Sequence, residues 1–452
     1  MIFVHDPLNA DTNRVTRSPG RFHFIRKNAP AIIFLIAFVV RLSPLLGVVE
    51  DRYRIGSEMS QVAQNIVQFH SFLDPYKESG DVRRPTGHVM PAYPLILASI
   101  YAVIPSRSHA DTVIHVITCF ISALAYALLP FAAGSLGLRR SVGVAAGIVG
   151  ALLPFHLRLE EEGSWDAAWT SLAFLLLACW SVRAWRARDL TTKWSVLNGL
   201  GWGVSILFSA TMLAVFVTTL TARVLIFCKS DLRRCLYSCS LTAAAASFML
   251  APWVVRNEFA FHRFVLTRTN LGLELFLSNN DLASPTLDFQ ENLAAMTRWH
   301  PRSSLAEARE IRRVGEIEYN HEKLLSAFAW ISSHPRHFAL LTLARIREFW
   351  FLSNPAPIKS VLPALFTVMG WTGLFLIRKK QPEAFSFLIL SIISYSFAYY
   401  FIQVSARYRY PIDWIFLLFS AVAIEALLLR LGVLRAAAPQ IASVAKQYTQ
   451  RT

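Results

Sequence analysis

Apolar runs recur along the chain, and their lengths predict a series of membrane-spanning helices. A spanning helix takes about 20 consecutive, mostly apolar residues. Runs of this kind cover residues 30–49, 112–136, 142–157, 165–185, 236–255, 361–377, 384–403 and 412–433. The run over 196–227 is too long for one span, and the sequence FSAT near its middle predicts a turn between two short spans.

The short run over 91–105 is bounded by prolines, so it is compatible with a span or with a helix lying in the membrane interface. Lys and Arg positions separate these alternatives, because cytoplasmic loops are enriched in both residues. If the run lies flat, the basic turns at 139–140, 183–193, 229–234 and 378–380 all share the side of the N-terminal tail. We therefore predict an all-α polytopic membrane protein of about ten spans, with both termini cytoplasmic.

This topology divides the chain into successive segments. It predicts a cytoplasmic tail at 1–29, a transmembrane core at 30–255 with its first outer loop at 50–111, an outer (periplasmic) segment at 256–360, C-terminal transmembrane helices at 361–433 and a cytoplasmic tail at 434–452. Periodic apolar residues after Glu58 predict an amphipathic juxtamembrane helix in the first outer loop. In the outer segment, the capping-box pattern from Ser304 to Glu307 predicts a helix that ends before Pro335. The stretch NLGLELFLSNND has the Gly and Asn content of a loop.

Composition agrees with a membrane protein. With 54% hydrophobic and 16% charged residues, the chain holds more apolar surface than a soluble domain of 452 residues could bury. The net charge of +16 is spread over short turns, which suits an anionic membrane leaflet and does not indicate nucleic-acid binding. The 5 cysteines fall within the predicted spans or near their cytoplasmic ends, so no disulfide framework is predicted outside.

Acidic residues on the predicted outer face are candidates for proton transfer. Glu58 lies at the start of the amphipathic helix, where it is either a helix-start acid favoured by the dipole or a general base facing a lipid-borne substrate. In RLEEEGSWDAAW, residues 158–169, the acids form either a solvated turn with a helix cap or part of a site. Asp166 is the stronger candidate there, with Glu162 behind it, because an acid next to a span is costly without a partner.

Basic and polar residues on the same face are candidates for substrate binding. Arg407, Arg409 and Arg256 lie at the outer ends of predicted spans, where arginines either snorkel to the interface or bind phosphate through a planar fork. Arg84 accompanies the acids of the first outer loop. Asn270 and Glu274 either bind sugar hydroxyls or make ordinary turn hydrogen bonds.

Several stretches occur in an order that resembles the GT-C superfamily of polytopic glycosyltransferases, in particular the glycosyltransferase family 39 group that uses polyprenyl-phosphate sugars. The stretches are RIGSEMSQVAQNIVQFHSF, RRPTGHVMPAYPLILASIY, LRRSVGVAAGIVGALLPFHLRLEEEGSWDAAW, NGLGWGVSILFSAT, APWVVRNEFAFHRFVLTRTNLGLELFLSNN, GEIEY, HPRHFALLTLARIREFW and ARYRYPIDWIFLL. The likeness covers the chain from about residue 30 to about residue 433. It implies a GT-C fold.

The resemblance also implies roles for single residues. Similar proteins carry a catalytic acid in the first outer loop, and its commonest position falls on Ile55 here. Glu58 matches the acid of a subgroup, and Asp51 is the second candidate. Asp166 matches a second acid of similar proteins. Two further matches are Arg407, in the A-R-Y-R-x-P ending, and His88, at the position of the family's His or Trp before P-x-Y-P.

The function implied is inverting transfer of a sugar from a polyprenyl-phosphate donor to an unidentified glycan, lipid or protein acceptor, at the periplasmic face of a bacterial inner membrane. Glu58 would take the acceptor proton, and Arg407 or Arg256 would stabilise the leaving phosphate. No tight metal site is expected, although the acids could hold a divalent ion weakly. Other function classes stay open: a lipid-linked glycan transporter, a ligase or polymerase, or an inactive scaffold, to which Ile55 points.

Overall fold

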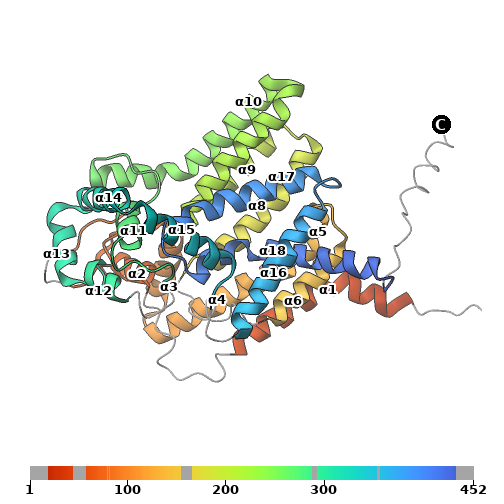
Figure 1. The fold of residues 1–452 in the computed structure, drawn as a ribbon, viewed down its shortest axis with the longest axis horizontal. Coiled ribbons are helices and arrows are strands. Elements are labelled where there is room, and N and C mark those ends of the chain that lie inside the picture. Colours follow the sequence, from red (N-terminus) through yellow and green to blue (C-terminus); the bar gives the residue numbers. More distant parts are fainter. Residues whose placement is uncertain are drawn as a thin grey trace, which may run out of the picture.

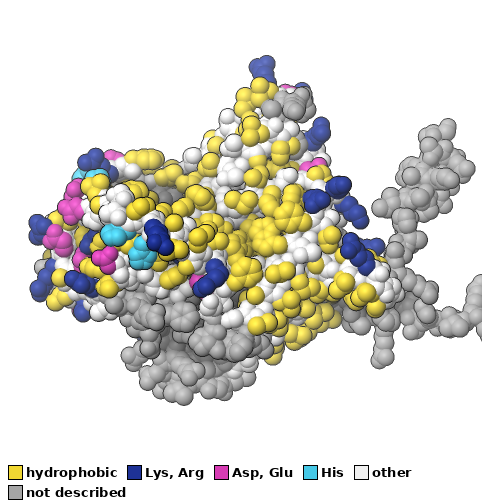
Figure 2. Space-filling model, in the orientation of Figure 1, with side chains coloured by type: hydrophobic (Ala, Val, Ile, Leu, Met, Phe, Trp, Pro, Cys, Tyr) yellow, Lys and Arg dark blue, Asp and Glu magenta, His cyan; other side chains and the backbone are white. Residues whose placement is uncertain are grey.

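A computed structural model describes residues 19–43, 57–78, 80, 82–153, 165–287, 293–353 and 357–433. Within these ranges the chain is helical, and the β-structure described consists of isolated bridges such as Leu73 with Pro85. Figure 1 shows a helical bundle on the right and a lobe of shorter helices on the left. Charged and histidine side chains gather on the lobe, whereas apolar side chains cover the visible face of the bundle (Figure 2).

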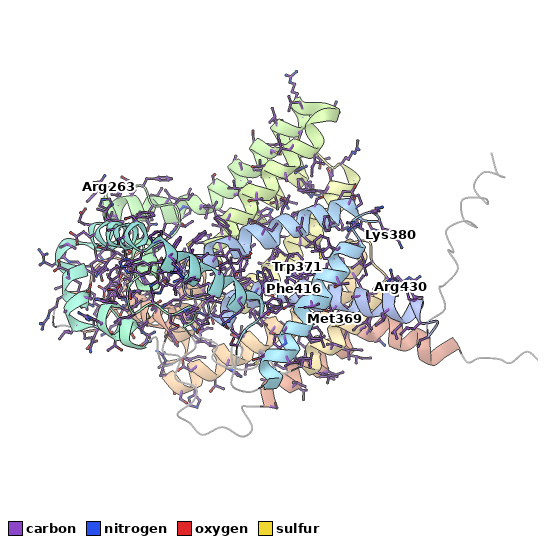
Figure 3. All side chains as sticks on the ribbon, viewed as in Figure 1. Arg263, Met369, Trp371, Lys380, Phe416 and Arg430 are labelled. Atoms are coloured by element: carbon purple, nitrogen blue, oxygen red, sulfur yellow. The ribbon has the colours of Figure 1, made fainter. Side chains whose placement is uncertain are left out.

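The bundle is built around its last helix, α18 (Ala406–Arg430), which is buried from Arg409 to Ser420. Its members besides α18 are α1 (Pro19–Leu42), α4 (Arg107–Ala127), α5 (Leu129–Ser135), α6 (Arg140–Leu152), α8 (Ala167–Ala187), α9 (Thr192–Phe208), α10 (Thr211–Phe261), α16 (Pro357–Leu376) and α17 (Pro382–Phe397). Helix α18 packs on α16, α6 and α8. Trp371 of α16 and Phe416 of α18 lie together in this packing, with ring centroids 5.6 Å apart (Figure 3).

Among the described residues, 5 helices are long and apolar enough to cross a membrane, which agrees with a multi-pass protein. They are Arg107–Ala127, Ala167–Ala187, Asp231–Phe261, Pro382–Tyr400 and Ala406–Arg430. Shorter apolar helices accompany them at Asn28–Leu42, Ala92–Val103, Arg140–Leu152, Thr211–Ile226 and Ser360–Leu376. The predicted turn in FSAT is confirmed, because α9 ends at Phe208 and α10 begins at Thr211.

Two observations bear on the predicted topology. Helix α3 (Ala92–Val103) has 12 residues, which is about 18 Å of helix and too short for an upright span. It packs instead on α2 (Glu58–Phe69) and α4. Lys380 and Arg430 lie at the end of the bundle away from the lobe (Figure 3). These two basic residues therefore lie at the opposite end of the molecule from the lobe, and the assignment of the two ends to sides of a membrane stays a prediction.

The lobe contains α2, α3 and the helices of the outer segment. These are α11 (Leu271–Ser278), α12 (Leu293–Trp299), α13 (Leu305–Val314), α14 (Glu316–Ser333) and α15 (Pro335–Trp350). The predicted cap is confirmed, since the Ser304 hydroxyl accepts a hydrogen bond from the backbone N–H of Glu307 at 3.5 Å. The predicted single helix is wrong, because it breaks at Gly315, where φ is +93°. That backbone conformation favours glycine.

The predicted loop over NLGLELFLSNND is also wrong, because most of it forms α11. Leu273 and Leu277 of this helix are buried against Tyr319 of α14 and its neighbours. Apolar burial therefore overrides the Gly and Asn content that favours a loop.

An arginine inside the bundle is held by backbone oxygens. Arg41 of α1 is 1% exposed, and its guanidinium donates to the carbonyls of Gly150 and Ala151 at 3.1 and 3.3 Å. Both carbonyls lie at the C-terminal end of α6, where the helix dipole favours a cation. Arg41 also donates to the Ser122 hydroxyl of α4 at 3.0 Å. It therefore joins three helices of the bundle.

Candidate active site

A cavity of about 90 Å³ opens where the lobe meets the bundle, and four of the predicted charged residues line it. Its charged lining residues are Glu58, Asp166, Arg268, Glu274 and Arg407. Aromatic rings form much of the remaining wall, from Trp165, Phe208, Tyr395, Tyr399 and Tyr408. Charged groups enclosed by low-dielectric walls interact more strongly than they would in water.

Glu58 is the first residue of α2, but its carboxylate is not needed to cap that helix. The Ser57 hydroxyl already accepts from the backbone N–H of Ser60 at 3.2 Å. The Glu58 side chain, 13% exposed, instead faces two imidazoles. Its oxygens lie 3.3 Å from Nε2 of His88 and 3.2 Å from Nε2 of His300. The carboxylate is therefore held inside a cluster of titratable groups.

The two imidazoles decide the charge of Glu58. Burial by itself would raise the pKa of this carboxyl, but the charges and hydrogen bonds of His88 and His300 outweigh it and hold the pKa well below its usual value. Burial would lower the pKa of His88, but the Glu58 carboxylate outweighs it and raises that pKa above its usual value. Glu58 is thus an ionised carboxylate next to a histidine that holds its proton tightly.

His300 is oriented by the backbone. It follows α12, and its Nδ1 accepts a hydrogen bond from the N–H of Arg302 at 3.1 Å. Because a backbone N–H can only donate, Nδ1 is unprotonated, and the proton of a neutral ring lies on Nε2, toward Glu58. His300 is therefore set up to donate to the carboxylate.

Glu58, His88 and His300 also offer ligand atoms within 4.8 Å of one another, and the kinds of ligand suit Zn²⁺. Metal binding through Nε2 of His300 would require the ring proton on Nδ1. That proton would then face the N–H of Arg302. The hydrogen bonding therefore favours a proton-sharing cluster over a metal centre.

Asp166 faces the cavity from the start of α8. It is the residue before that helix, yet its side chain makes no capping hydrogen bond to the helix backbone. The hydroxyl of Thr170 donates to it at 3.3 Å. Burial raises the pKa of the Asp166 carboxyl, although Arg268 and Arg407 act in the opposite direction.

Two arginines supply positive charge at the cavity. Arg407 lies over the ring of Trp165, with its central carbon 3.5 Å from the ring centroid, and one of its N–H groups donates to the Tyr408 hydroxyl at 3.2 Å. Arg268 donates through Nε to the carbonyl of His88 at 2.7 Å. Each guanidinium is therefore held in place by a neighbour, which suits recognition of a phosphate.

The structure brings together Glu58, Asp166, Glu274 and Arg407, which the sequence placed far apart on the outer face. His88 adjoins the cavity through Glu58. Asn270 adjoins it as well, because its amide donates to the Glu274 carboxylate at 2.8 Å. Asp51 and Glu162 lie outside the described residues.

Three predicted binding residues do not line the cavity. Arg409 pairs with Asp413 of the same helix at 2.8 Å and donates to the carbonyl of Trp350 in α15, so its guanidinium is engaged by groups outside the cavity. Arg256 donates to the carbonyls of Phe72 and Thr86 at 2.7 and 2.8 Å, which ties the first outer loop to α10.

The third of these residues, Arg84, is exposed. Its backbone N–H donates to the buried carboxylate of Asp74 at 2.7 Å. The hydrogen bond to Asp74 is thus made by the backbone of Arg84 and not by its guanidinium.

No pattern in the sequence marks Arg268, His300 or the tyrosines of the cavity wall as site residues. Arg268 lies two residues before Asn270, in the same outer stretch, but nothing in its spacing distinguishes it from a surface arginine. Tyr395, Tyr399 and Tyr408 lie near the outer ends of predicted spans, where tyrosine ordinarily marks a membrane interface.

No family model and no curated protein matches the sequence. Solved structures do match, among them the oligosaccharyltransferase AglB of Archaeoglobus fulgidus in complex with an inhibitory peptide and a dolichol-phosphate, with TM-score 0.55 and 13% identity over 91% of this chain. The apo form of the Archaeoglobus fulgidus oligosaccharyltransferase matches with TM-score 0.56 and 13% identity, also over 91% of this chain. The described chain has a GT-C fold.

The GT-C fold is the one that the resemblance implied. This chain spans about half of the archaeal chains, 51% in both comparisons. At this identity the likeness concerns the fold. The assignment to glycosyltransferase family 39 stays a prediction.

Proposed function

We propose that this protein is a membrane glycosyltransferase that moves a sugar from a polyprenyl-phosphate donor to an acceptor hydroxyl. The observation that carries the proposal is the cavity that Glu58 shares with Arg268 and Arg407, at the junction of a polar lobe and an apolar bundle. A carboxylate and two arginines are the groups that proton transfer and a leaving phosphate require. The fold supports the proposal, since a structural neighbour is an oligosaccharyltransferase solved with a dolichol-phosphate.

In the proposed reaction, the acceptor oxygen attacks the anomeric carbon while the bond from that carbon to the phosphate oxygen breaks. Glu58 takes the proton of the attacking hydroxyl, and the electron pair of the broken bond leaves with the polyprenyl phosphate. A single displacement of this kind inverts the anomeric configuration. Arg268 and Arg407 meet the negative charge that develops on the phosphate.

The ionised state of Glu58 fits this role in one specific way. A carboxylate with a low pKa is a weak base, so it accepts the proton only as the new bond forms and the hydroxyl becomes acidic. The aromatic walls of the cavity supply faces on which a sugar ring can pack. The polyprenyl chain would stay in the bilayer beside the bundle.

The test is donor consumption in membranes that contain the wild type or Glu58→Gln. A panel of polyprenyl-phosphate sugars is added, and free polyprenyl phosphate is measured by mass spectrometry. We expect release by the wild type and a loss of about 100-fold or more in the variant. Glu318→Gln is the matched control, because Glu318 is exposed on α14 outside the cavity.

Two outcomes would change the proposal. Release that survives Glu58→Gln moves the general base to Asp166, which Asp166→Asn then tests. No release from any donor by the wild type overturns the glycosyltransferase and leaves the transporter or scaffold classes.

A further inference from the structure

A buried carboxylate that does not line the cavity lies on the first residue of α14. Glu316 is 7% exposed. One of its oxygens accepts from the Tyr76 hydroxyl at 3.0 Å and from the Thr86 hydroxyl at 2.6 Å. The other accepts from the backbone N–H of Gly87 at 2.7 Å and from the hydroxyl of Thr269. Both oxygens of this carboxylate therefore accept hydrogen bonds from the neighbouring loops, which fills their capacity as acceptors.

These donors belong to the two segments that carry His88 and Arg268. Gly87 precedes His88 in the chain, and Thr269 follows Arg268. The segments are also bonded to each other, because the N–H of Thr269 donates to the Gly87 carbonyl at 3.1 Å and Arg268 donates to the His88 carbonyl at 2.7 Å. Glu316 thus lies at the joint between the partner of Glu58 and a candidate phosphate-binding arginine.

The two segments are closely packed at the point where they meet. A Cβ atom placed on Gly87 would lie 2.7 Å from Cγ2 of Thr269, closer than such atoms pack. The backbone of one segment therefore packs directly against a side chain of the other. A displacement of either segment at this contact would press on the other.

The next turn of α14 holds a third segment of the site. The side chain of Asn320 accepts from the N–H of Leu273 at 3.1 Å and donates to the carbonyl of Glu316 at 2.9 Å. A Cβ on Gly272 would collide with the backbone oxygen of Asn320, so α11 lies directly against α14. Glu274, which lines the cavity, belongs to α11.

Only a carboxylate satisfies the donors around Glu316. Each of its oxygens can accept two hydrogen bonds, whereas a glutamine would direct an NH₂ group at two of the same donors. The negative charge also strengthens every one of these bonds. Tyr76 remains a donor, because burial and the nearby Glu316 raise the pKa of its phenol above the usual value.

We propose that Glu316 is a positioning residue that fixes the His88 and Arg268 segments relative to Glu58, so that α14 and the lobe complete the candidate active site. The hydrogen bonds of Glu316 do not depend on what the protein catalyses, whereas the effect on catalysis rests on the proposed function. Glu316 touches neither substrate nor cavity; it acts through the two segments that it joins.

The experiment compares Glu316→Gln with Glu318→Gln, an exposed acid on the same helix. Hydrogen exchange of residues 84–90 and 265–272, the unfolding midpoint and donor turnover are measured on the full chain in detergent or nanodiscs. In Glu316→Gln we expect faster exchange in both segments, a kcat about 10-fold to 100-fold lower and an unfolding midpoint close to that of the wild type. Glu318→Gln should match the wild type in all three.

A further variant guards against misfolding of Glu316→Gln. Thr269→Val removes one hydroxyl donor and leaves the carboxylate, so a weaker change of the same kind is expected. Unchanged exchange in both segments overturns the proposal, as does a rise in exchange spread over the whole lobe. If the wild type consumes no donor, the proposed function fails, while the exchange data still decide whether Glu316 positions the segments.

Discussion

Nε2 of His300 lies 3.2 Å from a carboxylate oxygen of Glu58, while the other nitrogen of the same ring accepts from the backbone N–H of Arg302. The two residues come from different outer segments of the chain, at the end of α12 and the start of α2. The outer segment therefore does more than cover the first outer loop. It supplies a hydrogen-bond donor that, together with His88, lowers the pKa of the Glu58 carboxyl against the effect of burial.

Replacing His300 tests this relationship. His300→Phe removes the donor and keeps a ring, so the pKa of Glu58 should rise and the acid limb of the pH–rate profile should move toward neutral pH. His300→Gln can still donate through its amide and should change the profile less. Turnover in the Phe variant should fall about tenfold or more. His334→Phe, an exposed site on the lobe, is the control, and an acid limb that stays in place would contradict the assignment.

The two cavity arginines should bind the phosphate of the donor. Arg268→Gln and Arg407→Gln should each weaken binding of polyprenyl phosphate about tenfold, which corresponds to the loss of about 1.4 kcal/mol. Competition by polyprenyl phosphate in the turnover assay measures this affinity. Arg263→Gln is the control, because Arg263 is exposed at the far edge of the lobe (Figure 3). Equal losses in all variants would indicate a general charge effect and not a site.

The sequence indicated several charged residues as candidates for the site, but it did not distinguish the arginine that faces the cavity from one that does not. Glu58, Asp166 and Arg407 could be found because each is a charged residue beside a helix on the predicted outer face. Arg407 and Arg409 are two residues apart on α18 and therefore point to nearly opposite sides of it. Only the packing of α18 on its neighbours decides which of them meets the cavity.

The rest of the site depends on contacts between distant segments. His300 follows a short helix in the outer segment, and no pattern around it marks it as a partner of Glu58. The sequence predicts a loop where α11 forms, because Gly and Asn are local signals, whereas the burial of Leu273 and Leu277 depends on tertiary contacts. Single charged residues could therefore be predicted from the sequence, whereas the contacts that form the junction of lobe and bundle could not.

Asp166 should lower the stability of the fold at neutral pH. Its pKa is raised in the folded protein, so the folded state binds the proton more tightly than the unfolded state does. Relative to low pH, where the carboxyl is protonated in both states, the free energy of unfolding therefore falls as the pH rises through the folded pKa. Asp166→Asn should therefore raise the unfolding midpoint at pH 7 to 8 by about 2 °C, and this advantage should vanish at about pH 4.

Thermal unfolding of detergent-solubilised protein over this pH range measures the effect. Asp111→Asn is a suitable comparison, because Asp111 is also buried but pairs with Arg107 at 2.9 Å and should lose stability when neutralised. A lower midpoint for Asp166→Asn at neutral pH would mean that the arginines stabilise the ionised carboxylate more than burial opposes it.

Metal should act on the cluster of Glu58, His88 and His300 as a competitor of protons. Because Nδ1 of His300 accepts from the Arg302 N–H, a metal ion at Nε2 would have to displace the ring proton that faces Glu58. We expect turnover to stay within about twofold after chelation, and added Zn²⁺ to inhibit more strongly as the pH rises, because metal and protons compete for the same ligand atoms. Turnover with and without a chelator, together with zinc content by mass spectrometry, measures both effects.

His300→Gln should weaken the inhibition, because it removes one ligand of the three. If chelation abolishes turnover and Zn²⁺ restores it, these three side chains form a metal centre, and the proton on His300 must lie on Nδ1 in the active protein.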